Sequence, residues 1–285
     1  MDVFKTVDII RQFGSEITVT DIAVCLPGIL LFCSWLVKTS WGRRALVDSV
    51  PRRNNMRLYL PFIPLFIWFG PVGLAAVIAE ESFSGLPEWQ GTFLINLIYC
   101  IGGLAVTALI VLLARVSFAR RLKGFGLNVK TIHKDFLAGL VNLLAVWPLV
   151  MLTIILTLFL GQLIWGEGFQ LQQHEELKVI TAYPQLSLRI LIIVIAVVIA
   201  PVLEEMLFRG LFQTAIRSFF AKPWLSVVIS SVLFAAFHQP GHWPALFVLA
   251  VCLGYSYEKS GSLFRPIFIH SLFNATAVIA ALYSG

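Results

Sequence analysis

Eight apolar stretches, separated by short polar or basic segments, set the pattern of this chain of 285 residues. Most are near the ~20 residues that a helix needs to cross a hydrocarbon core of ~30 Å. The predicted spans are 19–37, 58–79, 93–114, 136–164, 188–212, 223–239, 244–257 and 263–283. The pattern therefore predicts an all-α, polytopic membrane helix bundle with about eight transmembrane helices.

Three of these spans have unusual features. The fourth is long and contains Pro148, so we expect it to be tilted or kinked. The sixth and seventh are short, and the segment QPGHWP joins them. We expect this turn to lie below the membrane surface, where protein or a water-filled cavity must satisfy its backbone.

Composition supports a membrane protein. Hydrophobic residues make up 59% of the chain and charged residues 13%, and the mean hydropathy is +0.88. These values lie far outside the range of a soluble globular domain. The lipid bilayer is thus the first partner that the sequence predicts.

Lysine and arginine concentrate in four connecting segments. Of the 21 basic residues, 17 lie in 38–57, 115–135, 209–222 and 258–265. The positive-inside rule places these segments in the cytoplasm, so both termini are predicted on the non-cytoplasmic side. The net charge of +6 is then explained by orientation and anionic lipid, and nucleic acid is not an expected partner.

A break at 165–187 divides the chain into two parts. Residues 1–184 hold the first four spans with their loops, and residues 185–285 hold the last four spans. Just before the boundary, residues 167–180 are predicted to form an amphipathic surface segment. It contains the letters HEEL, but Lys178 stands where a zincin motif needs its second histidine.

The second part has polar side chains inside its apolar spans, where an ionisable group costs ~2.5–3.5 kcal/mol on insertion. They are Glu204, Glu205 and Arg209 on the fifth span, His238 on the sixth, and His270 with Asn274 on the eighth. Glu204 and His238 both stand 17 positions from residue 221, at the turn between their spans (221 − 204 = 238 − 221 = 17). At ~1.5 Å per residue, Glu204, His238 and His270 are all expected ~12 Å below the cytoplasmic boundary.

Spacing within the fifth span suggests a division of roles. Glu205 and Arg209 are four residues apart and share a helix face, so Arg209 is expected to neutralise Glu205. Glu204, turned ~100° around the helix, is then free for another task. Pro201 is expected to kink this helix and release a carbonyl toward the same cavity.

A structural interpretation of the same residues is the alternative. A buried Glu–Arg pair can simply join helices. Asn274, which shares a face with His270, can likewise form a hydrogen bond between helices. The convergence of six polar residues on one depth favours a functional cavity. His242, in the turn QPGHWP, is interpreted as a loop residue.

Three motifs in order resemble those of the CPBP family, also called Abi, which includes the type II CAAX prenyl endopeptidases. They are EEMLFR (204–209), FAAFH (234–238) and HSLFN (270–274), and LGYSYEKSGSLFRPIFIHSLFNA looks like the family's third conserved block. The resemblance covers about residues 185–285. The first four spans match only in hydropathy and in the segment KGFGLN.

The resemblance implies an intramembrane endopeptidase. Glu204 would be the general base and His238 its partner in activating a water. His270 and Asn274 would polarise the scissile carbonyl and stabilise the oxyanion, for which each aimed donor is worth ~3–4 kcal/mol. None of the six residues to which the resemblance gives a role is a Ser or a Cys, which disfavours a covalent intermediate. The substrate would be a membrane-associated peptide or protein, with its lipidation left open.

Glu205 and Arg209 would be the supporting ion pair. No cofactor is expected. Glu204, His238 and His270 could together ligate Zn²⁺, but the resemblance favours a metal-free glutamate mechanism.

Two other functions stay open. A non-catalytic membrane scaffold or bacteriocin self-immunity protein of the same family would keep the fold without the chemistry. A proton-coupled carrier also buries Glu and His residues. A carrier would call for broken helices in two related halves, however, and the sequence contains no visible internal repeat.

Overall fold

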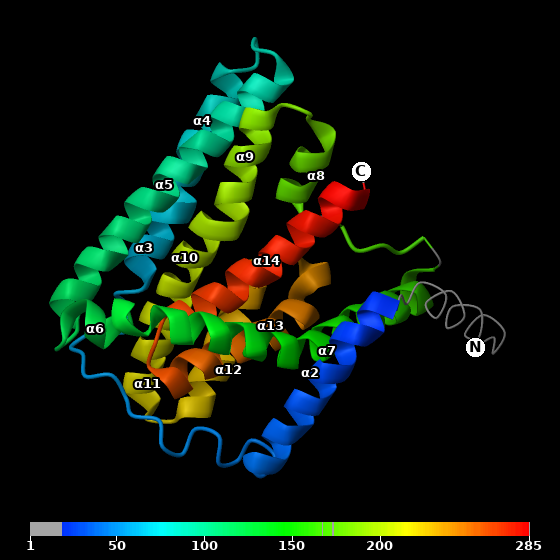
Figure 1. The fold of residues 1–285 in the computed structure, drawn as a ribbon. Helices are drawn as coiled ribbons and strands as arrows, with labels where there is room; N and C mark the ends of the chain where they lie inside the picture. Colours follow the sequence, from blue (N-terminus) through cyan, green and yellow to red (C-terminus); the bar gives the residue numbers. More distant parts are fainter. Residues whose placement is uncertain (1–18, 167, 173, 285) are drawn as a thin grey trace.

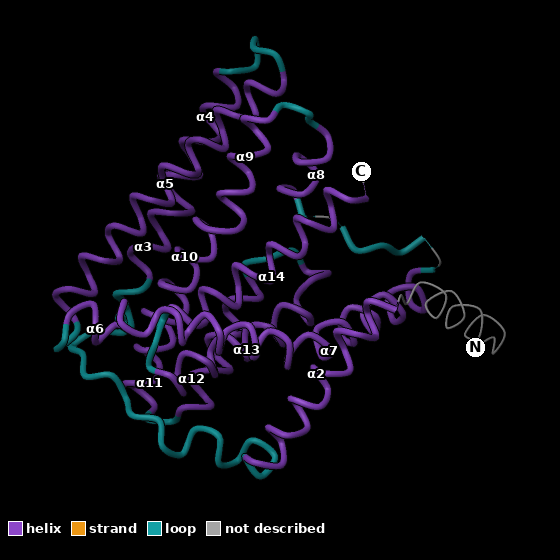
Figure 2. Tube along the Cα trace, in the orientation of Figure 1, coloured by secondary structure: helices purple, strands orange, loops and turns teal. Residues whose placement is uncertain are grey.

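The structure is a computed structural model that describes residues 19–166, 168–172 and 174–284. Residues 1–18 of the predicted N-terminal part therefore lie outside the described residues. Figure 2 shows helices and loops throughout the described part, and its one β-type pairing is an isolated bridge between Asn54 and Phe118. The predicted all-α fold class is confirmed.

The first part of the chain supplies four of the predicted spans. Its helices are α2 (Val19–Lys38), α3 (Phe62–Ile67), the π-helical η1 (Trp68–Val72), α4 (Gly73–Ser82), α5 (Glu88–Ser117), α6 (Arg121–Phe125), the 3₁₀ turn η2 (Val129–Thr131) and α7 (Ile132–Trp165). The span expected at 58–79 begins later, at Phe62, because Pro61 is the N-cap residue of α3. A proline fits at a helix start because it lacks the N–H that an interior position would need.

The second part supplies the other four. Its helices are α8 (Glu175–Ala182), α9 (Leu186–Val194), η3 (Ile195–Ile199), α10 (Ala200–Glu205), η4 (Met206–Gln213), α11 (Thr214–Phe220), α12 (Pro223–Ala236), η5 (Pro240–His242), α13 (Trp243–Ser260) and α14 (Phe264–Ser284). The fifth span extends eight residues beyond its predicted end, to Phe220. Arg217 stabilises this extension because it reaches Glu258 on α13 at 3.0 Å.

Five helical stretches are long and apolar enough to cross a membrane. They are Phe62–Ser82, Glu88–Ser117, Val129–Trp165, Leu186–Phe220 and Phe264–Tyr283. Ala23–Lys38 and Pro223–Ala236 are shorter apolar helices. With 14 residues, α12 reaches only ~21 Å at 1.5 Å per residue, which agrees with the short sixth span read from the sequence.

The helices form two groups that meet around α10 and α14. In the first group, α5 packs against α4, α9 and α10; in the second, α7 packs against α2, α13 and α14. Figure 1 shows α4, α5 and α9 side by side in one long arm, while α7 runs across the molecule beneath α14. The boundary predicted between residues 184 and 185 stays a prediction about the sequence. In the structure, α7 of the first part packs directly on α13 and α14 of the second part.

Helix α7 continues through Pro148 without a break. A proline in a helix interior leaves the carbonyl four residues earlier without its helical partner, here that of Leu144. Gly28 of α2 lies against Leu144 and Pro148, and a Cβ atom at Gly28 would overlap both residues. The glycine therefore allows the close packing of α2 on α7.

The four basic connecting segments gather at one end of the molecule. The loop after α2, helix α6, the turn from α11 to α12 and the turn from α13 to α14 all lie in the lower part of Figure 1. Arg265 donates to Asp135 at 3.1 and 3.2 Å across two of these segments. This clustering agrees with a shared membrane side, and the cytoplasmic assignment of that side stays a prediction.

Candidate active site

One long helix with two π-helical segments carries the acidic pair. Helices α9, η3, α10, η4 and α11 follow one another without a loop from Leu186 to Phe220. π-Turns are rare and often occur at functional sites. The segment η3 lies just before Pro201, and η4 begins directly after Glu205.

Pro201 was expected to leave a backbone carbonyl without its helical partner, and in the structure this carbonyl is that of Ala196. In a π-helix, the carbonyl of residue 196 would accept from the N–H of residue 201, but proline has none. Asn274 of α14 donates its Nδ2 hydrogen to this carbonyl at 2.8 Å. One of the two amide hydrogens of Asn274 is thus used to join α14 to η3, and the second remains for another acceptor.

Glu204 lies between two imidazoles. Its Oε2 is 3.9 Å from Nε2 of His238 and 3.9 Å from Nε2 of His270, and within the described part of the chain this oxygen has no hydrogen-bond partner. A separation of 3.9 Å exceeds a direct hydrogen bond and suits groups that share one water. The helical counting that placed these three residues at one depth is consistent with this geometry.

Both imidazoles are oriented by a bond at Nδ1. His238 contacts the carbonyl of Phe234 at 2.8 Å, and His270 contacts Oε1 of Glu205 at 2.9 Å. Because a carbonyl and an ionised carboxylate only accept hydrogen bonds, we assign the hydrogen to Nδ1 in both rings. The two Nε2 atoms are therefore directed at Glu204.

Glu205 and Arg209 form a fully buried ion pair of 2.9 Å, as predicted from their spacing. Arg209 also donates to the carbonyl of Ala250 on α13 at 3.2 Å. Its guanidinium lies 4.4 Å from the centre of the Phe234 ring. The pair therefore fixes three helices, and through its bond to His270 it also orients the site.

Sequence reasoning missed two features of this arrangement. Phe234 contacts the His238 ring at a centroid distance of 4.7 Å and the His270 ring at 5.6 Å, and its spacing of four before His238 was an available signal. The bond from Glu205 to His270 joins residues 65 positions apart, for which the sequence has no local signal.

The placement of His238 on a helix was wrong. Helix α12 ends at Ala236, and His238 lies two residues beyond it, in the turn toward η5. The Nδ1 bond to Phe234 holds its ring, and the indole of Trp243 donates to its backbone carbonyl at 2.8 Å. Both the side chain and the backbone of this turn residue are therefore held by hydrogen bonds.

The turn QPGHWP is covered by the segment before α8. His242 contacts the carbonyl of Gln172 at 2.7 Å, and its ring stacks on that of His174 at 4.5 Å. His242 is therefore more than a free loop residue. Burial, with smaller contributions from His242 and His238, lowers the pKa of His174 to about 4, so the His174 ring is uncharged near neutral pH.

The predicted amphipathic segment 167–180 is helical only in part. Helix α8 begins at Glu175, and residues 168–172 form the covering segment, while residues 167 and 173 lie outside the described ones.

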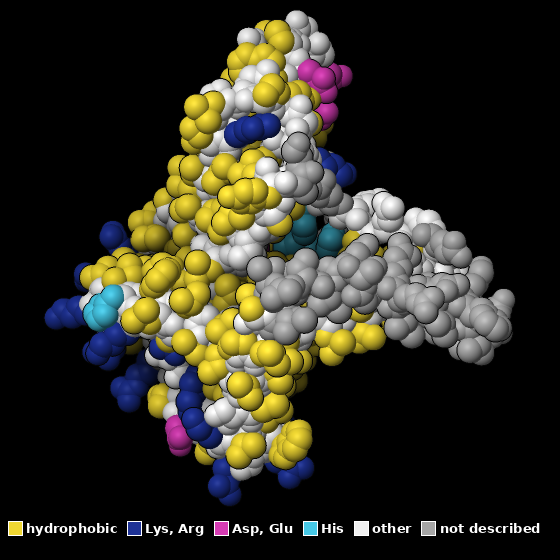
Figure 3. All heavy atoms as spheres, turned by 45° about the vertical axis from the view of Figure 1, so that its right-hand side comes forward, with side chains coloured by type: hydrophobic (Ala, Val, Ile, Leu, Met, Phe, Trp, Pro, Cys, Tyr) yellow, Lys and Arg dark blue, Asp and Glu magenta, His cyan; other side chains and the backbone are white. Residues whose placement is uncertain are grey.

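The site is open on one face. The side chains of Glu204 and His238 are 26% and 21% exposed, whereas that of His270 is 5% exposed. Figure 3 shows a hollow with histidine side chains at its bottom. The acid and one imidazole are thus partly exposed, while the second imidazole is buried and held by Glu205.

The donor set resembles a zinc site in chemistry more than in geometry. Two imidazoles and a carboxylate are Zn²⁺ ligands, and the Nδ1 bonds to a carbonyl and a carboxylate are typical of ligating histidines. Bonds of ~2.0–2.1 Å at tetrahedral angles put ligand atoms about 3.4 Å apart, less than the 3.9 Å found here. Among the described residues, no group of three or more His, Cys, Asp or Glu is arranged to hold a metal ion.

Comparison with known proteins supports a peptidase relationship for the part that carries this site. Residues 186–276 match the family model described as "Type II CAAX prenyl endopeptidase Rce1-like". The match includes Glu204, Glu205, Arg209, His238, His270 and Asn274. No curated protein and no solved structure matches the chain. The second part of the chain is therefore similar to a family of membrane proteases.

Proposed function

We propose that this protein is an intramembrane endopeptidase that hydrolyses a peptide bond with a water activated by Glu204 and His238. The observation that carries the proposal is the convergence of two imidazole Nε2 atoms on Oε2 of Glu204, each at 3.9 Å. Such a set can hold and deprotonate one water. The similarity of residues 186–276 to an endopeptidase family supports the same reaction.

The first step is attack by the water. Its oxygen bonds to the scissile carbonyl carbon while one of its protons moves to the Glu204 carboxylate, and the carbonyl electron pair moves onto the oxygen. His238 orients the water through Nε2, because its Nδ1 is fixed on Phe234. In the second step the carbon–nitrogen bond breaks, and Glu204 returns the proton to the leaving amine.

His270 and Asn274 stabilise the oxyanion in this proposal. The form of His270 proposed to bind the oxyanion carries a hydrogen on both ring nitrogens. Nδ1–H donates to Glu205, and Nε2–H then donates to the oxyanion. The second amide hydrogen of Asn274 is available to the same oxygen. Donors that are fixed before the reaction stabilise developing charge most effectively.

The substrate is a membrane-associated peptide or protein that enters from the bilayer side. The two long helices that carry Glu204 and His270 are apolar and long enough to cross a membrane, which favours a substrate that is itself held in the membrane. Lipidation of the substrate would add ~0.8 kcal/mol of membrane affinity per buried methylene. Cleavage on the cytoplasmic half is part of the proposal and follows from the basic segments.

Comparison of newly formed protein N-termini tests this function. Membranes from cells that carry the wild-type protein should contain cleaved termini that are absent with Glu204→Ala or His238→Ala, and purified wild-type protein in bilayers should cleave those substrates. A scaffold or immunity role predicts identical termini in all three strains and an unchanged cellular phenotype. That result would reject the peptidase.

Chelation tests the metal-free form of the mechanism. We expect 1,10-phenanthroline or EDTA to leave cleavage by the purified protein within twofold of the untreated rate, because the reaction needs only the carboxylate and the imidazoles. Activity that falls more than tenfold with chelator and returns with added Zn²⁺ would instead assign Glu204, His238 and His270 as ligands. A zinc protease of known dependence, treated in parallel, confirms that the chelator acts under the assay conditions.

A further inference from the structure

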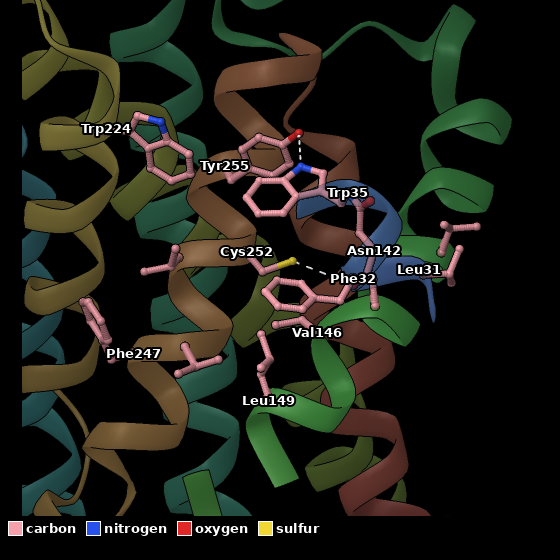
Figure 4. A pocket seen from close by; sticks show the side chains of 14 residues that line it. Leu31, Phe32, Trp35, Asn142, Val146, Leu149, Trp224, Phe247, Cys252 and Tyr255 are labelled. Atoms are coloured by element: carbon pink, nitrogen blue, oxygen red, sulfur yellow. Dashed lines mark hydrogen bonds between the residues drawn. The ribbon is translucent and has the colours of Figure 1, made fainter. Parts of the chain in front are cut away.

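A second cavity lies on the opposite side of α13 from the candidate active site. It has a volume of about 470 Å³ and lies among α2, α7, α12 and α13. Figure 4 shows Phe32, Val146, Leu149 and Phe247 directed into it, with Trp35, Trp224 and Tyr255 at one end. The volume falls within the ~300–1,000 Å³ of small-molecule sites.

Helix α13 separates the two sites by presenting a different stripe to each. Val248, Val251, Cys252 and Tyr255 line the cavity at the spacing of one helix face. The carbonyls of Ala250 and Gly254 face the other way, toward Arg209 and Gln213. A ligand in the cavity would therefore contact α13 without touching Glu204.

The cavity has one polar end. The Trp35 indole donates to the Tyr255 hydroxyl at 2.9 Å, and the Trp224 ring stacks on Tyr255 at 5.9 Å. The Trp224 indole donates to the carbonyl of Gly42 at 3.2 Å. Tryptophan and tyrosine are the side chains enriched at the membrane interface, and here three of them meet next to the basic loop after α2.

Four cations stand close in sequence to the residues of this aromatic end. Lys38 follows Trp35 by three residues, Arg43 and Arg44 follow Gly42, and Lys222 precedes Trp224 by two residues. All four are exposed. The other end of the cavity, around Leu149 and Phe247, is apolar (Figure 4). The arrangement thus places positive charge beside the polar end and hydrocarbon beyond it.

We propose that this cavity binds one acyl chain of an anionic phospholipid, with the headgroup among Lys38, Arg43, Arg44 and Lys222. Apolar walls in the membrane-embedded part select a hydrocarbon chain, and basic residues at the interface select a negative headgroup. The site is independent of the proposed peptidase chemistry. The bound lipid would join α2 and α7 to α13, the helix that holds Arg209 from its other side.

Filling the cavity tests the acyl-chain part. Ala145 lines it on α7, and Ala145→Phe should lower the fraction of protein that retains dioleoylphosphatidylglycerol at least tenfold, as measured by native mass spectrometry after exchange into detergent with a defined lipid supply. Leu156→Phe, on the exposed face of the same helix, is the matched control and should retain lipid as the wild type does. Equal retention by all three proteins would overturn the proposal.

Charge reversal tests the headgroup part. The wild type should prefer dioleoylphosphatidylglycerol to dioleoylphosphatidylcholine at least fivefold, and Lys38→Glu/Arg43→Glu/Arg44→Glu should remove the preference. The control Arg120→Glu/Lys130→Glu/Lys134→Glu changes the same charge at exposed positions of the basic end and should keep it. Equal effects of both triple variants would show general surface attraction and reject a headgroup site.

Two further outcomes identify a different occupant and also overturn the proposal. In one outcome, the wild type has the mass of two chains without lipid, and Ala145→Phe has the mass of one chain. This result would show that a second copy of the protein covers the cavity. Displacement of the phospholipid by a farnesylated peptide in the wild type would assign the cavity to substrate. Failure of the peptidase assay leaves these measurements unaffected, because none of them depends on cleavage.

Discussion

Glu204→Gln should abolish cleavage in a protein that remains folded. The amide keeps the size of the side chain but cannot accept a proton from water, so the general-base contribution of ~10²–10⁴ in rate is lost. The fold should tolerate the change, because Oε2 of Glu204 has no hydrogen-bond partner among the described residues and the side chain is 26% exposed. The predicted effect is therefore on kcat alone.

The measurement is single-turnover cleavage by purified protein in bilayers, together with the free energy of unfolding. Glu81→Gln is a matched control, since Glu81 is an exposed acid at the end of α4, in a different part of the bundle. It should cleave at the wild-type rate. Cleavage by Glu204→Gln at more than a tenth of that rate would remove Glu204 from the role of base.

Sequence reasoning reached the site because its main determinants are periodic. Equal counting from the turn at Ala221, which is the left-handed C-cap residue of α11, placed Glu204 and His238 together without knowledge of their partners. The spacing of four placed Arg209 on Glu205. The second inference depends only on helix geometry, whereas the first treated His238 as helical although α12 ends two residues before it.

Contacts between helices that are far apart in sequence could not be predicted by counting residues along each helix. Nothing in the sequence predicts that Glu205 accepts from His270 or that Asn274 donates to Ala196, because both contacts depend on the angle and register of α14 against α10 and η3. The π-helical segments were also missed. Pro201 indicated a free carbonyl, but not that it would belong to the fifth preceding residue, in the π-helical η3, instead of the fourth.

The cavity behind α13 belongs to the same class of unpredicted features. Its walls come from helices far apart in sequence, and apart from Asn142 each lining residue is an ordinary apolar or aromatic position of its own span. Only the packing of α2 on α7, which Gly28 permits, brings Trp35 to Tyr255. Composition indicated anionic-lipid contact for the basic segments in general, and the structure suggests a specific place for it.

Glu205→Gln should destabilise the protein, in contrast to Glu204→Gln. Glu205 and Arg209 are both fully buried, and removal of one partner leaves an uncompensated charge that costs ~3–5 kcal/mol. Glutamine still offers an acceptor, so we expect the lower part of this range. The free energy of unfolding by SDS titration in mixed micelles measures the effect, and the residual folded fraction should cleave more slowly because His270 loses its charged partner.

Removal of both charges separates stability from orientation. In Glu205→Gln/Arg209→Met no buried guanidinium is left unpaired, so the cost of an uncompensated buried charge is removed. The double variant should therefore regain most of the lost free energy of unfolding. Cleavage should stay reduced, because the Glu205 carboxylate that holds Nδ1 of His270 at 2.9 Å is still absent. If the double variant is as unstable as Glu205→Gln, the cost comes from packing around residue 205 and not from the charge of Arg209; if it regains full activity, Glu205 has no role in orienting His270.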